Sequence, residues 1–106
     1  MNNFIKPLLT LAEVEKRARM GKVRDIDFLM ENLETNGTFI NTRMIDYALG
    51  LVCTEEGGKR IKHFLFNGSR IQRNYAALYF KRQGNTWLLD EAVKKGCIDK
   101  IQAYSR

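Results

Sequence analysis

Helix stop signals recur along the whole chain at short intervals, and they constrain its fold more than any other feature. Glycine, alone or after a polar residue, repeatedly follows apolar positions spaced three and four residues apart. The stops are Gly21, Asn36-Gly37, Asn67-Gly68, Gly84 and Gly96. Glycine ends helices because it adopts the left-handed backbone conformation without steric cost. No segment alternates apolar and polar residues over the length of a strand. The sequence therefore predicts an all-α chain of about six helices and one final helical turn.

Polar residues that can cap a helix stand in front of most of the expected helices. Thr10 and Glu13 fit a capping box, in which the hydroxyl and the carboxylate each accept a backbone N–H. The caps expected for the second, third, fifth and sixth helices and for the last turn are Asp25, Asn41 or Thr42, Ser69, Thr86 and Asp99. The fifth helix, from Arg70 to Gln83, is expected to be the longest.

Composition and apolar spacing together predict one domain with a continuous core. The chain has 106 residues, of which 44% are hydrophobic and 28% charged, as in an average soluble protein. This length allows one domain, residues 1–106, and is too short for two. The predicted core residues are Leu11, Val14, Leu29, Leu33, Ile45, Ala48, Leu49, Ile61, Phe64, Leu65, Leu78, Leu89 and Ala92.

The expected helices repeat in pairs. Asn67-Gly68 follows Asn36-Gly37 after 31 residues, and Lys95-Gly96 follows 28 residues later. A single pair of short helices cannot bury its own apolar stripe, whereas stacked pairs bury a continuous core. We therefore predict a right-handed stack of about three antiparallel helical hairpins, a short α-solenoid with a small C-terminal helical cap. The hairpins are expected at residues 1–37, 38–68 and 69–106.

Residues 38–106 resemble a HEAT-like repeat. The run from Arg70 to Leu78 places an arginine before an Ala-Ala-Leu core, as the first helix of that family does, and Gly96 closes the second helix. Tyr47-Ala48-Leu49-Gly50 resembles the same core one repeat earlier. The chain departs from the family in its short repeats, in the lack of a proline opening the helices and in Phe64. The resemblance implies a solenoid-like stack used for binding and implies no chemistry. A tetratricopeptide array is the nearest alternative, but its 34-residue period and its Trp-Leu-Gly-Tyr pattern are missing.

Charge is concentrated in the second half of the chain. Residues 1–56 hold seven Lys/Arg and nine Asp/Glu, a net charge of −2, whereas residues 57–106 hold eleven and three, a net charge of +8. Between Gly57 and Leu89 there are seven basic residues and no acid. Such a dipolar molecule steers polyanions or acidic proteins toward its cationic half. The alternative is that these lysines and arginines only solvate helix surfaces.

No group of residues predicts catalysis or metal binding. His63 is the only histidine, and a catalytic histidine needs a nucleophile and an orienting carboxylate. Cys53 and Cys97 are 44 residues apart and do not match a zinc pattern. We predict two reduced thiols, no metal, no cofactor and no enzymatic activity.

Gly57-Gly58-Lys59-Arg60 lacks the spacing of a phosphate-binding loop. We interpret it as a flexible helix start, although a helix N-terminus beside Lys and Arg can hold an anion.

The basic residues of the second half supply the candidate binding site. On a helix that turns 100° per residue, Arg70, Arg73 and Lys81 point within about 80° of one another, with Asn74 on the same face. Arginine there can bind phosphate or carboxylate in bidentate fashion. It can equally brace the preceding hairpin, and the sequence does not decide between these uses. The candidate partner-binding residues are Lys59, Arg60, Lys62, Arg70, Arg73, Asn74 and Lys81.

These observations predict a non-enzymatic interaction module that binds an acidic surface of a partner protein through its stacked helices. The alternative is nucleic-acid binding by the basic half, residues 57–106, because helical-repeat DNA glycosylases cradle DNA on a basic concave face. The apolar stretch after Lys6 ends at Glu13 and is too short for a secretory signal or a membrane span. We expect a cytoplasmic protein without a membrane partner, and leave the oligomeric state open.

Overall fold

The computed structural model describes residues 9–35 and 37–105. Within them the chain forms seven helices and no strand, and 77% of the residues are helical, which confirms the all-α prediction. Residues 1–8, part of the first expected hairpin, and Asn36, part of an expected stop, lie outside the described residues. The helices are α1 (Leu11–Met20), α2 (Val23–Thr35), α3 (Phe39–Leu49), α4 (Glu55–Asn67), α5 (Arg70–Arg82), α6 (Thr86–Lys94) and α7 (Lys100–Tyr104).

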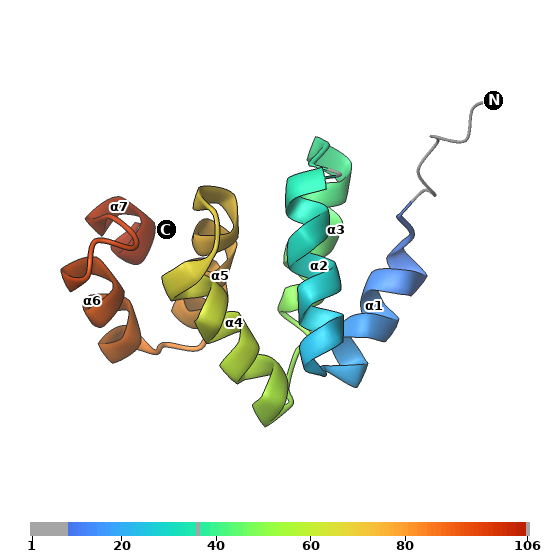
Figure 1. Cartoon of the computed structure of the whole chain (residues 1–106), viewed down its shortest axis with the longest axis horizontal. Coiled ribbons are helices and arrows are strands. Elements are labelled where there is room, and N and C mark those ends of the chain that lie inside the picture. Colours follow the sequence, from blue (N-terminus) through green and yellow to red (C-terminus); the bar gives the residue numbers. More distant parts are fainter. Residues whose placement is uncertain (1–8, 36, 106) are drawn as a thin grey trace.

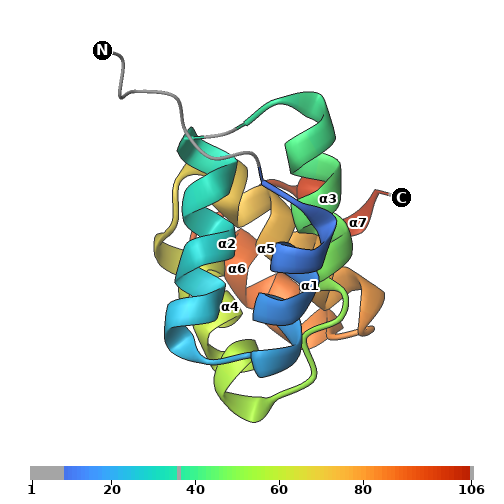
Figure 2. The ribbon, with the colours of Figure 1, turned by 90° about the vertical axis from the view of Figure 1, so that its right-hand side faces the viewer.

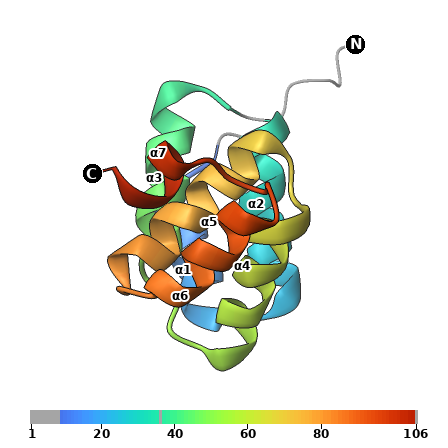
Figure 3. The same ribbon diagram turned by 90° about the vertical axis from the view of Figure 1, so that its left-hand side faces the viewer.

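The helices follow one another along an elongated molecule of 48 × 25 × 22 Å. Helices α1, α2 and α3 occupy one end and α6 and α7 the other, with α4 and α5 between them (Figure 1). The end view shows α1 flanked by α2 and α3 (Figure 2). At the opposite end α7 lies against α5 and α6 (Figure 3).

Helix α2 is the central element of the packing. It lies against α1, α3, α4 and α5, and α1 also contacts α3. Helix α4 packs mainly against α5 and α2, and its closest neighbours do not include α3, its partner in the expected hairpin 38–68. Contacts between helices two apart in sequence, such as α1 with α3 and α2 with α4, therefore hold the first half together.

The core runs along the whole molecule, and most of its predicted residues are buried. Three predictions were wrong. Leu11 is 48% exposed, because it opens α1 and helical side chains point toward the N-terminus, beyond the first turn. Leu78 is half-buried, because the buried residues of α5 all lie at least about 100° around the helix from it; they are Ala76, Ala77, Tyr79 and Phe80. Phe64 is half-buried and packs against the core from its margin.

Most of the expected helix ends were located correctly. Thr10 caps α1 by accepting the N–H of Glu13 at 3.1 Å, and Gly21 ends the helix with φ of 60°. Ser69 and Asp99 cap α5 and α7. The caps of α3 and α6 were placed too late, since Thr38 and Asn85 accept the N–H groups of Asn41 and Leu88.

Two acidic residues do not act as the sequence predicted. Asp25 is not the residue before α2 but lies inside its first turn and is 1% exposed. Its carboxylate accepts the backbone N–H of Lys22 at 3.1 Å and Nη1 of Arg17 at 3.3 Å. Glu13 does not complete a capping box; it accepts Nε of Arg17 at 3.1 Å. Arg17 thus joins α1 to the start of α2.

Candidate functional site

Several of the predicted cationic residues have partners inside the molecule. Arg60 on α4 binds Asp27 on α2 through two hydrogen bonds of 2.6 and 3.1 Å. Lys59 pairs with Glu55 one turn earlier in α4 at 3.3 Å. Lys62 is exposed, and no carboxylate among the described residues pairs with it. Of these three residues, only Lys62 keeps an unpaired charge.

Two of the predicted residues on α5 are also bound to nearby backbone. Arg73 is half-buried and donates from Nη1 to the carbonyl of Gly68 at 3.3 Å. Lys81 donates from Nζ to the carbonyl of Ser105, just after α7, at 2.6 Å. Arg73 therefore closes the turn before its own helix, and Lys81 ties α5 to the C-terminal segment.

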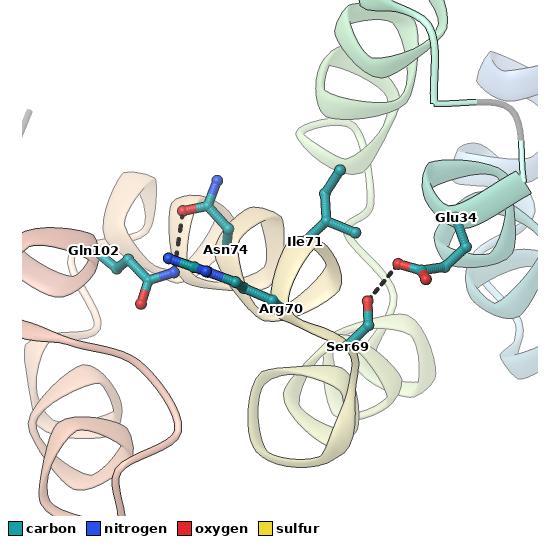
Figure 4. A pocket seen from close by; sticks show the side chains of 6 residues that line it. All are labelled: Glu34, Ser69, Arg70, Ile71, Asn74 and Gln102. Atoms are coloured by element: carbon teal, nitrogen blue, oxygen red, sulfur yellow. Dashed lines mark hydrogen bonds between the residues drawn. The ribbon is translucent and has the colours of Figure 1, made fainter.

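Arg70 and Asn74 line an open groove of about 570 Å³ at the start of α5. Figure 4 shows the Arg70 side chain directed toward Asn74 and Gln102 across this groove, with Glu34 on its other side. Arg70 is exposed, and no described carboxylate lies within ion-pair distance of it. The groove joins the end of α2, the first turn of α5 and α7, and it is lined by Glu34, Ser69, Arg70, Ile71, Asn74 and Gln102.

Hydrogen bonds fix the first turn of α5, from which Arg70 projects. Ser69 and Gln72 form a capping box: the N–H of Gln72 reaches Ser69 Oγ at 3.3 Å, and the N–H of Ser69 reaches Gln72 Oε1 at 2.9 Å. The Gln72 amide also donates to the carbonyl of Met30 on α2 at 3.0 Å. The backbone at Arg70 is therefore held in place on both sides.

The other polar groups of the groove are largely occupied by each other. The Ser69 hydroxyl donates to the Glu34 carboxylate, and the Gln102 amide donates to Asn74 Oδ1 at 3.5 Å. The Ser69 hydroxyl is neutral, so Glu34 keeps its negative charge on the α2 side of the groove. On the other side the unpaired Arg70 guanidinium lies beside amide groups, an arrangement that suits a single carboxylate or phosphate with polar neighbours.

The sequence predicts Arg70 and Asn74 but not Gln102 and Glu34, which also line the groove, or Gln72, which holds the first turn of α5. Gln72 and Gln102 each stand three residues after a helix cap, at the position of the capping-box partner, so a Ser-x-x-Gln and an Asp-x-x-Gln pattern would have found them. Nothing in the local sequence connects Glu34 with Ser69, which are 35 residues apart.

The thiols and the histidine take no part in this groove. Cys53 is exposed, Cys97 is half-buried, and both are free thiols. His63 is exposed at the surface of α4, with its ring edge-on to Phe64. Within residues 9–35 and 37–105, no three metal-ligating side chains come together. No helix in the same residues has the length and hydropathy that crossing a membrane requires.

Comparison of the chain with known protein families, with curated proteins and with solved structures found no match.

Proposed function

We propose that the protein is a non-enzymatic interaction module whose groove at the start of α5 binds an acidic segment of a partner protein. The observation that carries this proposal is Arg70. It is the only one of the predicted cations that both lines the groove and lacks an acidic partner among the described residues. Its backbone is fixed by the Ser69–Gln72 capping box, which reduces the entropy lost when a ligand binds.

The net charge of the cationic half, residues 57–106, supports an acidic partner. Residues 57–106 contain three acids, and each has a partner inside the molecule: Asp90 accepts the hydroxyl of Tyr104, Glu91 pairs with Lys95 at 3.3 Å, and Asp99 caps α7. The net charge of this half is +8, and Arg70 and Lys62 have no carboxylate partner among the described residues. A positive field of this kind raises the association rate with acidic proteins.

Contacts between distant residues support the further proposal that the helices form a short stack of hairpins. Thr54 donates to the carbonyl of Gly21, Glu56 accepts the N–H of Val23, and Arg60 binds Asp27, each pair being 33 residues apart. All three contacts join the start of α2 to the start of α4. The contact of α1 with α3 between Glu15 and Tyr47 spans 32 residues, and that of α3 with α5 between Asp46 and Arg82 spans 36. Such similar separations between helices two apart in sequence are typical of neighbouring repeats, and we propose a stack of short hairpins on this ground.

Nucleic-acid binding is the second candidate, and the net charge of +8 in residues 57–106 favours it. Phosphate contacts would have to come from residues such as Arg70 and Lys62, since Arg60 and Lys59 already bind carboxylates. A phosphate-driven complex weakens steeply as salt is raised, so salt dependence separates this candidate from the first.

The test is a titration of the isotope-labelled protein with a hexaglutamate peptide, followed by NMR chemical shifts. We expect shifts at Arg70, Asn74 and Gln102, and an affinity at least about tenfold weaker in Arg70→Glu. Lys62→Glu is the matched control, because it makes the same charge change at an exposed residue outside the groove.

Equal loss in both variants would mean that the peptide senses only the net charge, and the groove would be rejected. Tight, salt-sensitive binding of a DNA duplex or of single-stranded RNA, without shifts by hexaglutamate, would favour the nucleic-acid candidate instead.

A further inference from the structure

Helix α3 presents an apolar face to solvent at the end of the molecule opposite to α7. Phe39 is 75% exposed, Ile40 68% and Tyr47 48%. Together with Arg43, these residues lie within about 100° on the helix. The buried residues Ile45, Ala48 and Leu49 lie on the other side. Large apolar side chains grouped on one exposed face mark interaction sites in soluble proteins.

Two arginines border this face without a carboxylate partner. Arg43 is exposed and lies over the ring of Phe39, with Cζ 5.5 Å from the ring centroid. Arg19 is exposed on α1. The hydrogen bond to Glu15 raises the pKa of the Tyr47 phenol, and the charge of Arg19 acts in the opposite direction. Helices α1 and α3 pack side by side at this end (Figure 2). Neither arginine pairs with a carboxylate among the described residues.

The carboxylates nearest to this face are already engaged. Glu15 on α1 accepts the hydroxyl of Tyr47 at 2.8 Å, and this hydrogen bond raises the pKa of Tyr47. Asp46 binds Arg82 on α5 through two hydrogen bonds of 2.9 and 2.8 Å. Glu15 keeps its negative charge, because the Tyr47 hydroxyl is neutral. The exposed face therefore combines apolar surface with two arginines and one carboxylate, an excess of positive charge. Aromatic residues and arginine are also the side chains most enriched at the energetic centres of protein interfaces.

We propose that Phe39, Ile40, Arg43 and Tyr47 of α3, together with Arg19 of α1, form a second docking surface, called here the α3 face. Its ligand is a segment of a partner protein that carries aliphatic or aromatic residues next to Asp or Glu. Apolar side chains of the segment pack on Phe39 and Ile40, and its carboxylates meet Arg19 and Arg43. None of these five residues lines the groove of Arg70, so this proposal stands independently of the proposed function.

A second copy of the chain is a poor ligand for the α3 face. A symmetric contact between two copies places the same patch on both sides, so the second copy brings the same excess of positive charge to the interface. Like charges held together in an interface disfavour association by several kcal/mol. The excess of arginine on the α3 face thus favours a partner segment that carries carboxylates.

The test selects binders to the wild-type protein from a displayed library of random peptides and measures their affinity for variants. We expect the enriched peptides to combine Asp or Glu with Leu, Phe or Trp. Their affinity is expected to fall about tenfold or more in the double variant Phe39→Ser/Ile40→Ser and in Arg43→Glu. Because these side chains are exposed, both variants should keep the helical circular dichroism and the melting temperature of the wild type.

Trp87→Ser is the matched control, because Trp87 on α6 is 70% exposed, as Ile40 is, but lies at the other end of the molecule. Arg70→Glu serves as a second control and separates the α3 face from the groove. The proposal is overturned if no peptide is enriched, if the enriched peptides are basic, or if Trp87→Ser or Arg70→Glu weakens them as much as Phe39→Ser/Ile40→Ser. It is also overturned if the wild type instead binds anionic phospholipid vesicles and loses that binding in Phe39→Ser/Ile40→Ser, since the face would then be a membrane contact.

Discussion

The guanidinium of Arg60 on α4 forms a two-pronged hydrogen bond with the carboxylate of Asp27 on α2, Nε to Oδ1 at 2.6 Å and Nη2 to Oδ2 at 3.1 Å. The same guanidinium lies 5.3 Å from the ring centroid of Phe64. Arg60 therefore joins two helices that are neighbours in the packing but distant in sequence. The charge pattern assigns Arg60 to partner binding, and in the structure Arg60 holds α4 against α2.

We expect Arg60→Ala to lower the free energy of unfolding by about 1 kcal/mol. The two side chains are 30% and 41% exposed, and ion pairs open to solvent contribute only about 0–1 kcal/mol, to which the lost packing on Phe64 adds. Urea denaturation of Arg60→Ala, Asp27→Ala and the double variant measures the coupling. A coupling energy of zero would show that the pair does not join α4 to α2.

The helix boundaries were predictable because the signals for them are local. Gly21 ends α1 and Ser69 begins α5, and in each case the physical reason acts within one helical turn. Leu78, which is only half-buried, shows the limit of this reasoning, since an apolar residue at helical spacing is buried only if a neighbouring helix covers that side. The spacing of apolar residues does not show on which side of a helix the neighbouring helix packs.

The candidate site was predictable only in part for the same reason. Charge composition identified Arg70, but it could not separate Arg70 from Arg60, because the carboxylate that neutralises Arg60 is 33 residues away in sequence. The apolar face of α3 was missed altogether. Phe39 and Ile40 precede the predicted start of that helix at Asn41 or Thr42. The helix actually begins after its cap Thr38, so both residues belong to it and lie on its exposed face.

Gly57 and Gly58 are adjacent in α4, yet alanine is expected to have opposite effects at the two positions. A Cβ at Gly57 would lie 2.6 Å from Cγ1 of Val52 and 3.0 Å from the carbonyl oxygen of Gly21. Overpacking of this kind lowers the free energy of unfolding by about 1–3 kcal/mol. A Cβ at Gly58 would meet nothing nearer than the Tyr79 hydroxyl at 3.8 Å, so Gly58→Ala should gain about 0.5–1 kcal/mol from helix propensity. Thermal melts of the two variants check this; equal shifts would contradict the close approach of α4 to Gly21.

Leu49→Ala should destabilise the protein more than Leu78→Ala. Leu49 is 1% exposed in the core, and truncating a buried leucine costs about 2–5 kcal/mol. Leu78 is only half-buried, so its truncation removes less apolar contact and leaves a smaller cavity. Chemical denaturation compares the two variants, and a larger loss at Leu78 would show that α5 faces the core with its other side.

Tyr79 should make stability fall at high pH. Its hydroxyl donates to the carbonyl of Val52 at 3.2 Å, and burial raises the pKa of the phenol above its usual value of 10.0. The folded state thus favours the neutral phenol, so its contribution is complete below about pH 10 and is lost as the pH rises through the folded-state pKa. Tyr79→Phe is expected to be about 1 kcal/mol less stable at neutral pH. The deficit should shrink in urea denaturation at alkaline pH; a constant deficit would mean that Tyr79 does not titrate with unfolding.

Removing residues 98–106 should uncover apolar surface on α5 and α6 and promote self-association. Ile98 is 5% exposed and Ala103 is 1% exposed, and α7 lies against both helices (Figure 3). The deletion also removes the Ser105 carbonyl that accepts Nζ of Lys81 and the Gln102 amide that donates to Asn74. Apolar surface that loses its cover promotes association between molecules. We expect a lower melting temperature and a concentration-dependent increase in mass by light scattering.

Ile101→Ser should change neither, because Ile101 is 73% exposed. A truncated chain as stable and as monodisperse as the full chain would show that α7 covers no part of the core that matters for solubility.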